Sequence, residues 1–133
     1  MATERTVALV ALRLAAAVTA AAMGAIHLYL WYEGYRYLHI IGPLFLLNGV
    51  GAALLVLSLL ITPTRLLPVL ATLGTLFTAG TLAALIVSLT SGLFGFREYL
   101  DADLVKPALA VEAVGCVTLV ALASLSRRGR PDR

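Results

Sequence analysis

Four long apolar stretches account for most of this 133-residue chain and limit what it can fold into. They cover residues 7–31, 40–62, 66–90 and 104–125. A helix of roughly 20 apolar residues crosses the ~30 Å hydrocarbon core of a bilayer, and each stretch is long enough to do so. Because the stretches are rich in Ala and Leu and do not alternate, strands are disfavoured. We predict an all-α fold, a bundle of four transmembrane helices that forms a single membrane domain over residues 1–133.

The composition supports a bilayer as the solvent of this chain. It is 61% hydrophobic and 13% charged, whereas soluble domains are near half apolar and a quarter charged. The first stretch is not typical of a cleaved signal, because Arg13 interrupts it and its apolar character continues to Trp31. The only cysteine, Cys116, lies inside the fourth stretch, where no second cysteine is available for a disulfide.

The basic residues predict how the chain is oriented. Arg5, Arg13, Arg65 and the tail Arg127, Arg128, Arg130 and Arg133 fall on one side, and only Arg36, Arg97 and Lys106 fall on the other. Cytoplasmic segments carry the excess of Lys and Arg. We therefore expect a multi-pass protein of the bacterial cytoplasmic membrane with both termini in the cytoplasm. The net charge of +3 follows this topology, so the expected partner is the lipid bilayer and no nucleic acid is expected.

The two halves of the chain share a pattern that suggests an internal repeat. Gly-aromatic-Arg occurs at 34–36 and 95–97, and Pro-x4-polar-x-Val-Gly occurs at 43–51 and 107–115. Each half then reads as a helical hairpin, and the two hairpins would be parallel repeats about an axis normal to the membrane. The alternative is that these residue types are simply common at helix ends. The short turn at 62–65 also predicts that the second and third helices are antiparallel neighbours.

The polar positions of this repeat, Asn48 and Glu112, are the main candidates for a site. A carboxylate near the centre of a membrane helix costs about 2.5 kcal/mol or more, so it usually faces a partner, a ligand or a cavity. Each residue lies five positions after a proline, roughly 7–8 Å into the helix. His27 lies about one turn inside its own helix end. If all three face the bundle axis, they meet in the outer third of the bilayer, as a proton relay, a ligand pocket, a metal half-site or a strut that fixes helix register.

The connection after the first helix is dense in aromatic residues. One interpretation is an interfacial belt, in which Trp and Tyr anchor the helix at headgroup depth. The other is a lid in which Tyr35 and Tyr37 cover the mouth of the pocket, while Arg36 pairs with Glu98 or Asp101. We also count His39 and Arg97 among the candidate ligand-binding residues, since both are in the outer connections.

The second connection carries Phe94, Phe96 and Tyr99, whose spacing predicts one face of a short interfacial helix. Asp103 is expected to cap the last helix, because its carboxylate can accept free N–H groups of the first turn.

The sequence contains little that indicates a cofactor or a catalytic site. His27 and His39 flank one connection and were considered as axial ligands of haem, but His39 should lie at the interface, about a turn shallower than His27. No His, Cys or Asp spacing is typical of a metal site, and no phosphate-binding loop, serine elbow or metalloprotease motif occurs. We therefore predict no cofactor, no metal and no catalytic residues, and leave enzymatic activity unsupported.

The segments 27–31, 34–36 and 41–48 resemble small four-helix integral membrane proteins of actinobacteria. The resemblance covers most of residues 24–125 and implies a four-helix protein of the inner membrane, without an activity or site residues. A weaker likeness to the DoxX-like group rests on helix number, helix length and an outward-facing cluster of His and aromatic residues.

Three functions follow from these patterns. The first is an accessory or structural membrane subunit, in a homo-oligomer or a larger membrane complex, since the chain is small and its helices carry small residues at packing positions. The alternative is an outward-facing protein that binds or transports a small molecule or a proton through His27, Asn48 and Glu112. The last is a redox protein associated with haem or a quinone.

Overall fold

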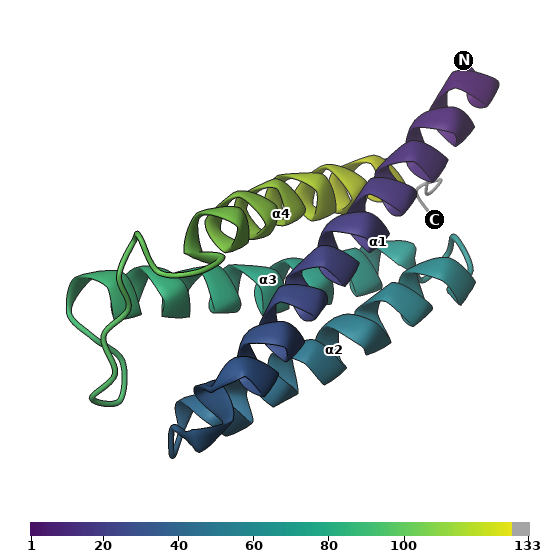
Figure 1. The fold of residues 1–133 in the computed structure, drawn as a ribbon. Helices are drawn as coiled ribbons and strands as arrows, with labels where there is room; N and C mark the ends of the chain where they lie inside the picture. The colour runs from purple at the N-terminus through teal and green to yellow at the C-terminus, as the bar shows by residue number, and fades with distance from the viewer. Residues whose placement is uncertain (129–133) are drawn as a thin grey trace.

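The computed structural model describes residues 1–128 and confirms an all-α four-helix bundle (Figure 1). Each of the four α-helices is long and apolar enough to cross a membrane. Two of the basic tail residues used to predict the orientation, Arg130 and Arg133, lie outside the described residues. The elements are α1 (Ala2–Glu33), the 3-10 helix η1 (Tyr35–Tyr37), α2 (Ile41–Ile61), α3 (Leu67–Thr90) and α4 (Val105–Arg127).

The bundle has two distinct ends. One end, here called the terminal end, holds the beginning of α1, the end of α4 and the turn between α2 and α3. The other, the loop end, holds the two longer connections, residues 34–40 and 91–104. Around the bundle, large apolar side chains such as Leu54, Leu73 and Val117 are exposed. Such a surface suits a lipid environment.

The four helices do not pack evenly. α1 packs against α2 and α4, and α3 packs against α4, whereas α2 and α3 have few contacts. The prediction that α2 and α3 are antiparallel neighbours is therefore wrong along most of their length, because they diverge from their shared turn (Figure 1). A short turn fixes only the helix ends that it joins. Close approach needs small residues, and α1 and α2 have them: a Cβ placed on Gly24 would lie 2.7 Å from the Cβ of Ala52.

Arginine side chains stabilise the terminal end. The Arg13 guanidinium donates hydrogen bonds to the carbonyl oxygens of Leu59 and Thr62, at the C-terminal end of α2. Arg5 donates in the same way to the Leu125 carbonyl near the end of α4. The last carbonyls of a helix commonly lack a partner within it, and cations are favoured at that pole of the helix dipole. Arg13 therefore joins α1 to the end of α2.

The second connection differs from the sequence prediction. The described residues between α3 and α4 contain no helix; Leu93 and Phe96 instead form an isolated antiparallel bridge. Asp103 does not cap α4. The position before that helix is Leu104, which has a left-handed backbone (φ 59°), and no side chain caps the first turn. The chain thus reverses direction before α4 begins, and this leaves Asp103 outside the helix start.

The two Gly-aromatic-Arg segments also have different backbones. Gly34 is extended (φ 166°) and precedes η1, whereas Gly95 is left-handed (φ 77°) and lies within the bridged turn. The internal repeat therefore stays a prediction from the sequence.

Candidate functional site

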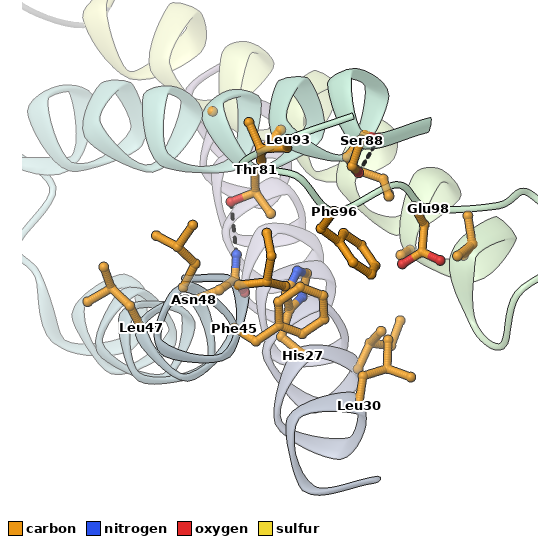
Figure 2. A pocket seen from close by; sticks show the side chains of 18 of the residues that line it. His27, Leu30, Phe45, Leu47, Asn48, Thr81, Ser88, Leu93, Phe96 and Glu98 are labelled. Carbon is orange, nitrogen blue, oxygen red and sulfur yellow. Dashed lines mark hydrogen bonds between the residues drawn. The ribbon is translucent and has the colours of Figure 1, made fainter. Parts of the chain in front are cut away.

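A cavity of about 360 Å³ occupies the loop end of the bundle. All four helices and the connection between α3 and α4 contribute to its walls. Most of the lining is apolar, and polar groups project into it at a few points (Figure 2). This combination is typical of sites for small molecules, in which a few polar groups orient a mainly apolar ligand. The polar lining residues are His27, Asn48, Thr81, Ser88 and Glu98.

The mouth of the cavity lies between α2 and α3. Two lining residues on these helices, Leu47 and Leu76, are 63% and 66% exposed. The lining residues contributed by α1 and α4 are buried or half-buried and form the floor. Since α2 and α3 barely touch, the opening faces sideways, toward the lipid that would surround the helices.

His27 lies on the floor of this cavity and is held from both sides. Its Nδ1 is 2.9 Å from the Met23 carbonyl oxygen, which can only accept, so Nδ1 carries a proton. Its Nε2 consequently points to Glu112, with 3.8 Å between Nε2 and Oε1. The ring of Phe45 packs on the imidazole at 4.8 Å between centroids.

Glu112 is completely buried behind His27. Its side chain is 0% exposed, and neither carboxyl oxygen has a hydrogen-bond partner among residues 1–128. It does not line the cavity itself; Ala108, one turn earlier on α4, does. Among residues 1–128, the ion-pair partner of the carboxyl group is the His27 ring. One proton placed between Nε2 and Oε1 would leave the pair neutral overall, which avoids burying a net charge.

Asn48 joins α2 to α3 across the cavity. Its Nδ2 donates a hydrogen bond of 2.8 Å to the Thr81 hydroxyl oxygen, as Figure 2 shows. Its Oδ1 is buried and has no partner in the described chain. His27 and Asn48 thus line one cavity and His27 meets Glu112, but the amide of Asn48 bonds Thr81 and neither of the other two candidates.

Aromatic rings form the roof of the cavity at the loop end. Tyr35 stacks on Phe45 with centroids 4.6 Å apart, and meets Phe96 edge-on at 5.7 Å. Its hydroxyl donates a 2.7 Å hydrogen bond to Oε2 of Glu98, a residue that is only 6% exposed. Burial, followed by the hydrogen bond and the negative charge of Glu98, raises the pKa of Tyr35 above its ordinary value. The other Glu98 oxygen, Oε1, accepts the backbone N–H of Tyr99 at 3.1 Å.

The remaining predicted candidates lie outside this cavity. Arg36 does not pair with Glu98; it lies over the rings of Tyr32 and Tyr37 and donates a hydrogen bond to the Tyr37 hydroxyl. Glu98 is directed inward to Tyr35, and this leaves Arg36 on the surface. Tyr37, His39 and Arg97 are all exposed. Of the two tyrosines proposed as a lid, neither lines the cavity; Tyr35 contacts three residues that do, Phe45, Phe96 and Glu98.

Three residues of the site were not singled out from the sequence for the roles they have. Nothing in the sequence distinguishes Thr81 or marks Phe45 as the ring between His27 and Tyr35, and the place of Glu98 in a connection suggests a surface ion pair. Within residues 1–128, no group of three or more His, Cys, Asp or Glu side chains is arranged to hold a metal ion. Comparisons with protein-family models, with curated proteins and with solved structures gave no match.

Proposed function

We propose that this protein binds a small amphipathic molecule that enters from the bilayer between α2 and α3. The main support for this proposal is the shape of the cavity. It opens sideways among apolar side chains and has buried polar groups on its far walls. A molecule that arrives through lipid would meet the exposed Leu47 and Leu76 first and the buried His27 and Asn48 further in. The sequence alone favours an accessory or structural subunit. Because the structure contains this cavity, we propose ligand binding as the main function instead.

We further propose that the loop end faces the exterior of a bacterial cytoplasmic membrane. The basic residues support this orientation, because Arg5, Arg13 and Arg127 belong to the terminal end. The site then lies in the external half of the bilayer, with Tyr35 between the cavity and the aqueous phase.

Asn48 and Thr81 are proposed to hold α2 and α3 together behind the opening. Their hydrogen bond is a polar link between two helices that otherwise have few contacts. Such bonds contribute about 0.6 kcal/mol on average in membrane bundles, which a ligand can offset by using the same amide and hydroxyl groups. Separation of α2 and α3 would then admit a ligand without disturbing the packing of α1 on α2.

A cavity-filling variant tests the proposal. Ala84 lines the cavity on α3, whereas its neighbour Ala83 is exposed and does not line it. We expect native mass spectrometry of the protein, released from a neutral detergent, to detect a bound small molecule. Ala84→Phe should abolish this species and Ala83→Phe should retain it. Detection of the same species in all three proteins, or of none in the wild type, would contradict ligand binding in this cavity.

A further inference from the structure

The charge balance of the cavity is uneven. Its lining contains one carboxylate, Glu98, and neither a lysine nor an arginine. No lysine or arginine within residues 1–128 forms an ion pair with Glu98; its oxygens accept only the Tyr35 hydroxyl and the Tyr99 N–H. The second carboxyl group, that of Glu112, lies behind His27, and within residues 1–128 it forms an ion pair with no basic side chain other than that ring.

Hydrogen-bond acceptors are also in excess. Asn48 is 6% exposed and lines the same cavity, and its Oδ1 has no donor among residues 1–128. Buried polar atoms normally have a partner, so an unpaired acceptor on a residue that lines a cavity suits an occupant that carries a donor. Glu98 belongs to the connection between α3 and α4, whereas Asn48 belongs to α2. A molecule between them would therefore be contacted from two sides (Figure 2).

The walls near Glu98 are aromatic. Phe45 and Phe96 line the cavity; Tyr35 stacks on Phe45 and meets Phe96 edge-on. The faces of such rings attract cations, most strongly where water is excluded. Aromatic rings beside an unbalanced buried carboxylate form an environment that suits a positively charged group with apolar substituents.

We propose, on the basis of the function proposed above, that the ligand is an amphipathic organic cation, with its charged nitrogen beside Glu98 and the aromatic rings and its apolar part between α2 and α3. The floor suits this assignment as well, because a His27–Glu112 pair that shares one proton would add no net positive charge to repel the ligand. An anionic ligand would have to approach Glu98 without a cation to balance it.

Two probes of the same shape test the charge requirement. Phenyltrimethylammonium and tert-butylbenzene differ by the replacement of the charged nitrogen with carbon. We expect the wild-type protein in dodecyl maltoside to bind the cation at least tenfold more tightly than the neutral compound, measured as saturable thermal stabilisation. This comparison needs no substitution and is independent of any effect of a variant on folding.

Variants then assign the charge to a residue. Glu98→Gln keeps the shape of the side chain and removes its charge, so we expect at least a tenfold loss of affinity for the cation. The matched control is Glu33→Gln, because Glu33 is an exposed carboxylate at the end of α1. This variant should bind the cation as tightly as the wild type does.

The outcomes separate this inference from the function on which it rests. Equal affinity for both probes, lost for both in Ala84→Phe, would overturn the cation assignment and leave a ligand-binding cavity. If the cation binds tightly but Glu98→Gln binds it equally well, the role of Glu98 is wrong. If neither probe binds saturably, or if Ala84→Phe binds as the wild type does, the cation assignment and the cavity proposal both fail.

Discussion

His27 and Glu112 form a buried pair, and the contribution of each side chain to the free energy of unfolding depends on the presence of the other. The carboxyl group of Glu112 is fully buried with only the His27 ring close to it, so removal of His27 leaves a buried polar group without a neighbour. We expect His27→Leu to lower the free energy of unfolding by about 1–3 kcal/mol. His27→Leu combined with Glu112→Leu should recover most of this loss, because replacing both partners by apolar groups is often close to neutral.

This coupling is measured by thermal unfolding, in dodecyl maltoside, of the wild type, His27→Leu, Glu112→Leu and the double variant. His39→Leu and Glu33→Leu provide a control pair of the same residue types, since both side chains are exposed at the loop end. Their effects should add within about 0.5 kcal/mol, as expected for independent sites. Equally additive effects for His27 and Glu112 would show that the two side chains do not act as a pair.

The sequence identified some of these residues better than others. Glu112, Asn48 and His27 were recognisable because each is a polar group within an apolar helix, where burial has a large and calculable cost. Glu98 and Thr81 lacked that signal. A threonine within a membrane helix usually bonds its own backbone, as Thr81 also does to the Phe77 carbonyl. The burial of Glu98 is set by Tyr35, a residue 63 positions away, and no local pattern predicts such a contact.

At the scale of elements, Gly24 determines how closely α1 approaches α2. A methyl group on Gly24 would lie 2.7 Å from the Ala52 Cβ and 3.5 Å from the Gly49 carbonyl oxygen. Gly24→Ala gains helix propensity, worth up to about 1 kcal/mol, but must push the two helices apart. We expect a net destabilisation of about 1–3 kcal/mol, as for other overpacked sites, seen as a lower unfolding temperature.

Gly80→Ala is the matched control for this substitution. A Cβ on Gly80, which lies on α3, meets no atom within 4 Å, so the same change of residue type gains helix propensity without a clash. We expect Gly80→Ala to be neutral or slightly stabilising. If both variants had the same effect, close approach of α1 and α2 at Gly24 would not contribute to stability.

The sequence predicted the elements and missed part of their arrangement. Helix limits followed from long apolar runs, and the structure begins α2, α3 and α4 within about one residue of the expected positions. α1 begins five residues earlier than expected, at Ala2, because its first turns continue past the apolar run. The divergence of α2 and α3 was not predictable from their short turn, since it depends on which helix faces fit together. That divergence opens the cavity.

At the scale of the whole molecule, the asymmetry of the two ends is the main feature. At the terminal end, small and branched apolar residues fill the core, and Arg13 and Arg5 bond the ends of α2 and α4. At the loop end, α2 and α3 separate and the cavity takes the place of a core. The better-packed half is thus suited to hold the helices together while the other half changes shape.

The proposed orientation leads to a prediction about labelling in intact cells. In a Cys116→Ala background, Thr64→Cys places a thiol in the turn between α2 and α3, and Asp101→Cys places one at the loop end; both positions are exposed. Because cytoplasmic segments carry the excess of basic residues, a membrane-impermeant maleimide should label the Asp101→Cys protein in intact cells and the Thr64→Cys protein only after lysis. The reverse pattern would place the cavity in the cytoplasmic half of the bilayer, where Tyr35 would separate it from the cell interior and a ligand would have to come from the inner leaflet.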